Sequence, residues 1–112
     1  MLIKNQLNKF KLSDFQVKVL LKIKSIPRGR VTTYQILAKA ISRPKAMRAV
    51  ANALNINPLI VELPCHRVVR SGGQVGGYVK GVKNKIAILK KEGVDVRQGR
   101  VVNFEKKLYH FN

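Results

Sequence analysis

The residues with the clearest chemical potential are Cys65 and His66, which are adjacent in the segment PCHR at 64–67. Cys65 is the chain's one cysteine, and a cysteine attacks as its thiolate although the free thiol has a pKa of about 8.5. His66 could accept the thiol proton, and Arg67 with the basic chain around it would favour the anion. A buried structural cysteine is the commoner fate of a lone cysteine, so adjacency alone leaves both interpretations open.

Backbone geometry limits how Cys65 and His66 can cooperate. Neighbouring side chains on a regular strand point to opposite faces. The pair can therefore act together only if the chain turns here or if a water molecule bridges the two groups. Pro64 favours an irregular backbone just before them.

Glu92 is one of five acidic residues and ends a lysine-rich segment that reads as a helix. A cation would suit that position better, because the C-terminal end of the helix dipole is negative. A carboxylate there suggests a group that orients a histidine. A salt bridge to a nearby lysine is the alternative, and the sequence leaves both open.

The charge of the chain restricts its partners. Its 112 residues contain 23 Lys and Arg against 5 Asp and Glu, a formal net charge of +18. This excess predicts binding to a polyanion, with nucleic acid the first candidate and an anionic membrane surface the second. A merely solvated basic surface is the alternative, although so large an excess repels itself.

Composition excludes several other classes. The length suits one small domain, and the hydrophobic fraction of 46% can build a core. No apolar run approaches the roughly 18 residues of a membrane span, and the N-terminal segment does not resemble a signal peptide. One cysteine excludes an internal disulfide, and one Cys with two His is too few for a four-ligand zinc site. We expect no metal, no membrane, and a reducing compartment that is cytoplasmic or, in a eukaryote, nuclear.

Helical patterns dominate the first half of the chain. A helix is predicted over 13–26, where Ser13 and Gln16 have capping-box spacing. Thr32 and Gln35 repeat that spacing and open a second helix to about residue 41. A tight connection at 42–44 leads to a third helix over 44–55. Two short helices joined by a three-residue turn indicate a helix-turn-helix.

The third helix is predicted to be amphipathic. The side expected to face the core has helical spacing and consists of Met47, Val50, Ala51 and Leu54. The opposite side consists of Lys45, Arg48, Asn52 and Asn55. Alanines at 46, 49 and 53 border this polar side, where they either permit close approach to a groove or simply favour the helix.

The second half is predicted to combine short strands with one helix. The β-branched, glycine-punctuated segment 68–78 suggests a hairpin or wing. A helix over 81–92 would turn its lysines outward, end at Gly93, and face inward with Val82, Ile86 and Leu89. The tail would form a two-stranded turn around 98–99 and a short helical end.

These elements predict a mainly α fold, a winged helix-turn-helix DNA-binding domain with a small β hairpin or wing. The chain is expected to be one domain over 1–112. Its parts would be an N-terminal extension at 1–12, a core at 13–93 and a tail at 94–112.

Six segments carry a resemblance to a known family: PCHRVV at 64–69, TTYQILA at 32–38, RPKAMRAVANAL at 43–54, NP at 57–58, GGYVKG at 76–81 and KEG at 91–93. In them the chain resembles the catalytic C-terminal domain of the O6-alkylguanine-DNA alkyltransferases, also called methylated-DNA–protein-cysteine methyltransferases. The similarity is strong from Phe15 to Gly93 and weaker through the tail.

The resemblance implies roles for the matching residues around the cysteine. Cys65 would accept the alkyl group, His66 would take the thiol proton through a water molecule, and Glu92 would orient His66. Asn57 would brace the turn between the third helix and the site.

Contacts to DNA are implied in the same way. Arg48 would enter the base stack in place of the flipped nucleotide, Tyr34 would lie near the 3′ phosphate and help rotate the nucleotide out, and Ser71 would contact a phosphate. The guanine pocket would use the Tyr78 ring, the Val79 amide, and the carbonyls of Cys65 and Val68.

The implied activity is direct, irreversible transfer of an alkyl group from O6-alkylguanine in duplex DNA to Cys65, with O4-alkylthymine a second candidate substrate. The protein would bind the minor groove and flip out the damaged base. It would act once per molecule, as a suicide enzyme and a monomer, with no cofactor.

Three features depart from the family pattern. Many members have a separate N-terminal domain, whereas residues 1–12 alone precede the first predicted helix; the starting Met and family-like tail favour a naturally minimal form. Ala51 and Asn52 stand where small glycines often occur. Val79 replaces a serine found in some members, so a backbone contact would survive there but a hydroxyl contact would not.

Two rival functions fit parts of the sequence. A lesion-binding protein of the alkyltransferase-like group would share this domain, but such proteins lack the acceptor cysteine. A basic winged-helix transcription factor would leave PCHRVV, Tyr34 and Glu92 unexplained.

Overall fold

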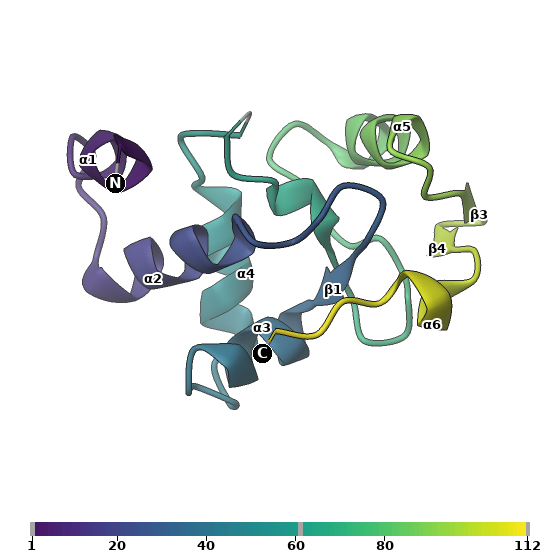
Figure 1. Ribbon diagram of the computed structural model, residues 1–112, viewed down its shortest axis with the longest axis horizontal. Coiled ribbons are helices and arrows are strands. Elements are labelled where there is room, and N and C mark those ends of the chain that lie inside the picture. The colour runs from purple at the N-terminus through teal and green to yellow at the C-terminus, as the bar shows by residue number, and fades with distance from the viewer. Residues whose placement is uncertain (1, 61, 112) are drawn as a thin grey trace.

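The computed structural model describes residues 2–60 and 62–111, and its regular structure is mainly helical (Figure 1). The helices in these residues are α1 (Leu2–Leu7), α2 (Asp14–Ile23), α3 (Tyr34–Ala40), α4 (Met47–Asn55), the 3-10 helix η1 (Cys65–Arg67), α5 (Val82–Lys91) and α6 (Phe104–Lys107). The strands are β1 (Thr32–Thr33), β2 (Val68–Val69), β3 (Val96–Arg97) and β4 (Arg100–Val101). None of these helices has the length and hydropathy that a membrane span requires.

Helix α2 begins at the predicted capping box. The Ser13 hydroxyl accepts from the Gln16 amide at 3.1 Å, and the Ser13 amide donates to the Gln16 side chain at 2.9 Å. The helix ends at Ile23, three residues before the predicted end, because the chain turns there and leaves Ile26 buried beyond the helix. The capping pair is confirmed, and it places the apolar side of α2 against the core.

The predicted cap of α3 is wrong by one residue. Thr33 caps the helix, since its hydroxyl accepts from the Ile36 amide at 3.0 Å. Thr32 belongs to β1, and its hydroxyl donates to the Tyr109 carbonyl at 2.9 Å. A long-range contact with the tail therefore decides which threonine is free to cap.

Helix α4 completes the helix-turn-helix but is rotated relative to the prediction. It starts at Met47 rather than near residue 44, and it packs through Val50, Ala53 and Leu54. The inward placement of Met47 is wrong, because 41% of that residue is exposed, and Ala53 lies in the core rather than on the polar border. The predicted polar side, Lys45, Arg48, Asn52 and Asn55, is exposed as expected.

Strands β1 and β2 pair in parallel, with Thr32 opposite Val68 and Thr33 opposite Val69. Side chains alternate along a strand, so Val68 joins one hydrophobic cluster with α2, α3 and α4 while Val69 joins a second with α5 and the tail. The segment 68–78 therefore does not form a hairpin of its own. It contributes β2 and a loop, because β1 takes the place of the expected partner strand.

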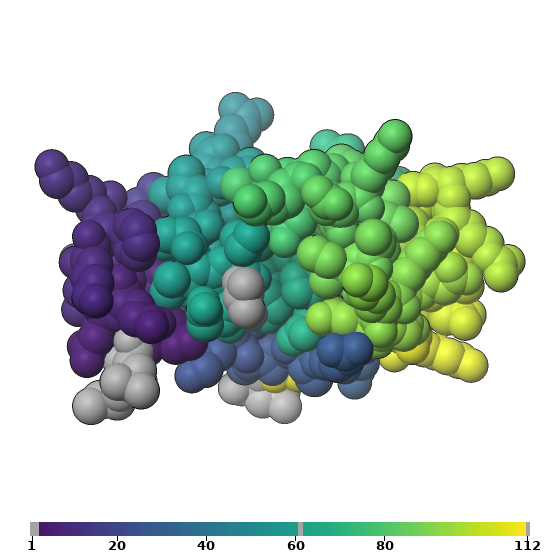
Figure 2. Space-filling view, turned by 90° about the horizontal axis from the view of Figure 1, so that it is seen from above, coloured from purple at the N-terminus to yellow at the C-terminus, as the bar shows by residue number. Residues whose placement is uncertain are grey.

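The small hairpin lies in the tail, where the sequence also predicted a two-stranded turn. Strands β3 and β4 pair antiparallel around 98–99, and α6 follows. The tail then returns to β1 and α3, where the Val31 amide donates to the Lys107 carbonyl at 2.9 Å and the Tyr109 amide donates to the Val31 carbonyl at 2.7 Å (Figure 1). Seen from above, the N-terminal, central and C-terminal segments follow one another along the long axis (Figure 2).

Helix α5 shows the largest departure from the predicted pattern. Leu89 is fully buried as expected and Ile86 is half-buried, but Val82 is 45% exposed. Lys85, predicted to face water with the other lysines, is 0% exposed. The face that packs inward is therefore centred on Lys85 and Leu89, one turn apart, and Val82 lies outside it.

Lys85 ties α5 to two backbone segments. Its Nζ donates to the carbonyl oxygen of Val68 at 2.7 Å and to that of Gly77 at 3.0 Å. It also lies 5.9 Å from the centre of the Tyr34 ring. Burial lowers the pKa of this amine to about 8, although a thiolate at Cys65 would act in the opposite direction.

Replacing Lys85 should change how stability depends on pH. The unfolded amine titrates near 10.5 and the folded one near 8, so between these values the unfolded chain binds more protons and the free energy of unfolding rises with pH. We expect Lys85→Met to remove a rise of at most about 3 kcal/mol over this range. Urea unfolding from pH 7.5 to 10.5 measures it, with the exposed Lys83→Met as the matched control. An equal rise in the parent and Lys85→Met would contradict the assignment.

Candidate functional site

The site begins with a turn at η1. Pro64 precedes the helix, and the Arg67 amide donates to the Pro64 carbonyl at 3.0 Å. The chain therefore turns between Cys65 and His66, which removes the geometric objection to their acting together. Both are nearly inaccessible, with 5% and 6% of their surfaces exposed.

Asn57 braces the connection between α4 and η1. Its side-chain amide donates to the Leu63 carbonyl at 2.9 Å, and its side-chain oxygen accepts from the Leu59 amide at 2.9 Å. Both polar ends of a buried residue are thus satisfied by backbone on one loop. This is the position at which the sequence predicted a brace.

The resting form of Cys65 is the thiol. Burial raises its pKa, while the Asn57 side chain and the Lys85 ammonium act in the opposite direction without cancelling the effect. Arg67, expected from the sequence to favour the anion, is engaged with Glu92 and is not one of the groups that lower the pKa of Cys65. A nearby base is therefore needed to take the proton when Cys65 reacts.

His66 is arranged as such a base. Its Nε2 lies 3.0 Å from Oε1 of Glu92, and an ionised carboxylate can only accept, so Nε2 carries the proton of the neutral ring. Nδ1 is then unprotonated, and it is buried without a hydrogen-bond partner among the described residues. Burial lowers the pKa of His66, with Arg67 and Lys85 acting in the same direction and Glu92 opposing them.

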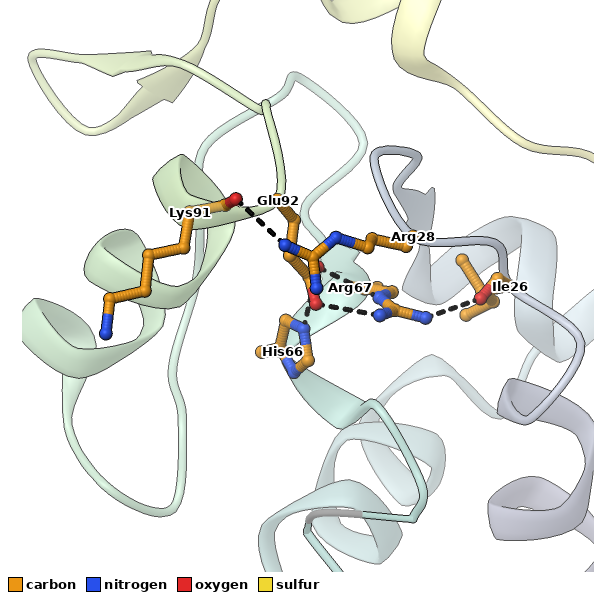
Figure 3. A network of polar contacts seen from close by, with 6 residues as sticks. All are labelled: Ile26, Arg28, His66, Arg67, Lys91 and Glu92. Carbon is orange, nitrogen blue, oxygen red and sulfur yellow. Dashed lines mark hydrogen bonds and ion pairs between the residues drawn. The ribbon is translucent and has the colours of Figure 1, made fainter.

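Glu92 is shared by the Arg67 guanidinium and the His66 ring. Arg67 donates from Nε to Oε1 at 3.0 Å and from Nη2 to Oε2 at 2.7 Å, and its Nη1 donates to the Ile26 carbonyl at 2.8 Å (Figure 3). Burial alone would raise the pKa of Glu92, but the hydrogen bonds from Arg67 and His66 lower it overall. The carboxylate contacts the histidine, as one of the two open interpretations held, and its ion-pair partner is an arginine rather than a lysine.

A cleft of about 580 Å³ lies between α4, the start of α3 and the loop after β2. Three of the residues predicted to contact DNA, Tyr34, Arg48 and Ser71, line it together. The other residues of its wall are Met47, Ala51, Asn55, Arg70, Gly76 and Gly77. Arg48 and Arg70 are exposed and make this wall positive.

Tyr34 connects the cleft with the buried site. Tyr34 packs against the hydrophobic cluster that contains Cys65, and it shares the cleft wall with Arg70. Burial raises the pKa of its phenol, and Arg70 acts in the opposite direction. A Cβ atom on Gly76 would lie 3.1 Å from the Tyr34 hydroxyl oxygen. Glycine at 76 therefore allows the loop to approach the tyrosine, and its φ of +72° also favours glycine.

The predicted pocket residues lie in different environments. The Tyr78 ring is 6.4 Å from that of His66, edge to face, whereas Val79 is 45% exposed and is not among the residues that line the cleft. The carbonyls of Cys65 and Val68 already accept from the Val68 amide and Lys85 Nζ. Each carbonyl has a second lone pair for another donor. The Ser71 hydroxyl lies 3.4 Å from the Gln35 side chain.

Sequence reasoning missed the parts that Lys85 and Arg67 play in the site. Lys85 lies one helical turn before Leu89, so the spacing places both on the inward face of the helix, but a lysine was not expected in the core. No sequence signal pairs Arg67 with Glu92, which is 25 positions away. Within residues 2–60 and 62–111, no three His, Cys, Asp or Glu side chains gather closely enough to hold a metal ion.

Comparison with known proteins places this geometry in a family. The family model for the 6-O-methylguanine DNA methyltransferase DNA-binding domain matches residues 14–94. A methylated-DNA–protein-cysteine methyltransferase of Methanosarcina acetivorans is 44% identical over 81 residues, which are 72% of this chain and 52% of that protein. The chain spans about half or less of the length of the curated relatives it matches.

Solved structures agree with the fold. Mycobacterium tuberculosis OGT in complex with DNA is 38% identical with a TM-score of 0.71, over 73% of this chain and 51% of that one. S. pombe Atl1, in complex with damaged DNA containing O6-carboxymethylguanine, is 25% identical with a TM-score of 0.79, over 91% of this chain and 100% of that one. With a family model that covers most of its residues, this chain belongs to the 6-O-methylguanine DNA methyltransferase family and carries its DNA-binding domain.

Proposed function

We propose that this protein repairs alkylated DNA by transferring the alkyl group from O6 of guanine to Sγ of Cys65, once per molecule. The observation that carries the proposal is the buried Nδ1 of His66, which has no hydrogen-bond partner within residues 2–60 and 62–111, on the residue next to the one thiol, with Nε2 held by Glu92. The names of the relatives support the same chemistry. We further propose that residues 1–112 form one domain that corresponds to the catalytic C-terminal part of longer relatives.

The transfer is a displacement at the alkyl carbon. The thiol proton moves to Nδ1 of His66, directly or through a water molecule, and Sγ attacks the carbon as it becomes the thiolate. The S–C bond forms as the C–O6 bond breaks, and the electron pair remains on the guanine, whose oxygen the Val79 amide meets. The guanine finally takes up a proton and the His66 imidazolium gives one up, directly or through solvent, so that the products are a thioether, an unmodified base and a neutral His66.

The damaged base reaches Cys65 only after it leaves the stack, because the sulfur is buried in the protein and the O6 atom lies inside the duplex. Arg48 is exposed on the wall of the cleft and would fill the gap left in the stack. Tyr34, on the same wall and near Cys65, would guide the nucleotide, and Ser71 would hold a phosphate. Double-stranded DNA, bound by a monomer through its minor groove, is therefore the proposed partner.

Lesion binding without transfer is the second candidate. The likeness to S. pombe Atl1 extends over that whole chain, and the pKa of Cys65 is raised rather than lowered. The two functions differ in one product, a covalent adduct on Cys65. The mass of the protein after reaction with alkylated DNA therefore separates them.

Cys65→Ser should abolish alkyl transfer and leave DNA binding largely intact, because a serine hydroxyl is a poor nucleophile without strong activation. Incubation with duplex DNA that carries labelled O6-methylguanine, followed by mass spectrometry, measures the adduct. The parent should gain one methyl group per molecule and the variant none. A parent that binds the lesion but gains no methyl group would favour the second candidate.

Arg48→Ala should slow repair in duplex DNA more than reaction with free O6-alkylguanine base, because the duplex alone requires flipping. A guanidinium that offsets about 1.4 kcal/mol of the unstacking cost corresponds to about a tenfold loss of rate on duplex. Single-turnover kinetics on both substrates measure the difference. Lys45→Ala is the matched control, since it removes the same charge from an exposed residue that does not line this cleft. Equal losses on both substrates would place Arg48 in folding or chemistry instead.

Alkylation of Cys65 should destabilise the protein. The sulfur lies in the hydrophobic core cluster with 5% of the residue exposed, and extra carbon atoms there overpack the core at a cost of about 1–3 kcal/mol. Calorimetry should show a Tm lower by about 4 °C or more for the S-methyl form, and a larger drop for the S-benzyl form. Cys65→Ser treated with the same DNA is the control, and an unchanged or higher Tm of the methylated parent would contradict the prediction.

A further inference from the structure

Arg67 takes no part in the steps of the proposed transfer, yet it donates two hydrogen bonds to Glu92, whereas His66 donates one. Two of its guanidinium nitrogens hold the two carboxylate oxygens, and a third nitrogen holds the Ile26 carbonyl (Figure 3). The planar fork is thus fixed on both sides. The side chain is 16% exposed and that of Glu92 is 7% exposed, so solvent and salt screen the pair weakly.

We propose that Arg67 is a positioning residue that holds Glu92 ionised and aimed at His66 Nε2, and thereby keeps the His66 ring neutral with Nδ1 free to receive the Cys65 proton. This inference rests on the proposed function for its catalytic meaning. The protonation state of His66 that it predicts can be measured in the protein without DNA.

The charges around His66 determine whether its ring takes a second proton. Glu92 alone would draw a second proton onto the ring, because an imidazolium beside a buried carboxylate forms an ion pair. Arg67 already neutralises that carboxylate and adds a positive charge that repels the imidazolium. The titratable and charged groups that face His66 from the elements around it are Lys85 on α5, Glu92 at the C-cap of α5, Cys65 and Arg67 on η1, and Tyr78 on the loop before α5.

Loss of Arg67 should therefore raise the pH at which the His66 ring loses its second proton. Glu92 would be left with His66 as its cationic partner, so the ring would keep its second proton to a higher pH. A doubly protonated ring has no lone pair on Nδ1 and cannot accept the thiol proton. The acid limb of the transfer rate against pH should move to higher pH, while the rate on the alkaline side of that limb stays close to that of the parent.

Arg28 provides a matched control. It joins the same two parts of the molecule, the segment after α2 and the end of α5, by donating from Nη2 to the Lys91 carbonyl at 3.1 Å (Figure 3). It makes no contact with Glu92 among those described. Arg28→Gln thus removes one arginine and one tie between the segments but leaves the carboxylate with both of its partners.

Nitrogen-15 NMR of the imidazole side chains over pH 4–9 tests the inference in the parent, Arg67→Gln, Arg67→Lys and Arg28→Gln. His110, which is exposed, is replaced in all four proteins (His110→Gln) so that the signals belong to His66. The pH dependence of single-turnover methyl transfer is measured on the same proteins. Arg67→Lys keeps the charge without the two-pronged contact.

The parent should show a neutral ring protonated on Nε2 at pH 7. The protonation midpoint should rise in Arg67→Gln, stay near the parent value in Arg28→Gln, and lie between them in Arg67→Lys, with the acid limb of the rate moving in parallel.

An unchanged midpoint in Arg67→Gln, or an equal rise in Arg28→Gln, overturns the inference. If Arg67→Gln does not fold, the parent spectrum and Arg67→Lys decide: an imidazolium, or a ring protonated on Nδ1, in the parent at pH 7 overturns it. A parent that transfers no methyl group refutes the proposed function, and the NMR midpoints still decide the inference about Arg67.

Discussion

The Glu92 carboxylate lies almost out of reach of water, with 7% of its side chain exposed, at the end of a lysine-rich helix. An ionised carboxylate in that environment requires partners that neutralise it and satisfy its oxygens. Arg67 and His66 supply them, and both stand on the turn that carries Cys65. The rest of the site depends on this one constraint, because it joins the end of α5 to η1 and, through the Ile26 carbonyl, to the chain that follows α2.

Charges are distributed differently in the interior of the site and on the surface of the protein. The surface has a large excess of Lys and Arg over exposed acids and suits a polyanion, whereas the buried groups are few, mixed in sign and closely paired. Lys85 and Asn57 are held by backbone carbonyls and amides on the chain that surrounds the thiol. Burial leaves Cys65 as a thiol and His66 as a neutral ring, although Asn57 and Lys85 favour the thiolate and Glu92 favours the imidazolium. In the proposed reaction the thiolate would therefore form only as the proton moves to His66.

Local sequence determined the features that depend on neighbouring residues. The capping box at Ser13, the turn at 98–99, the end of α5 before Gly93 and the exposed side of α4 were all predictable, because each depends on residues within about one turn of helix or one tight turn. The family motifs also identified Cys65, His66, Asn57 and Glu92, which the structure brings together around η1. The cleft brings together Tyr34, Arg48 and Ser71, although no local pattern predicts a cleft.

Other features were decided by tertiary structure alone, because long-range partners there compete with the local preference of the chain. Thr33 rather than Thr32 caps α3 because the tail engages the Thr32 hydroxyl, and β2 pairs with β1 rather than with the loop after it. Lys85 is buried because two carbonyls, at 8 and 17 positions from it, receive its ammonium group. Arg67 meets Glu92 and Ile26 across 25 and 41 positions. Sequence spacing carries no signal for such contacts, since their free energy depends on which groups the folded chain places together and shields from water.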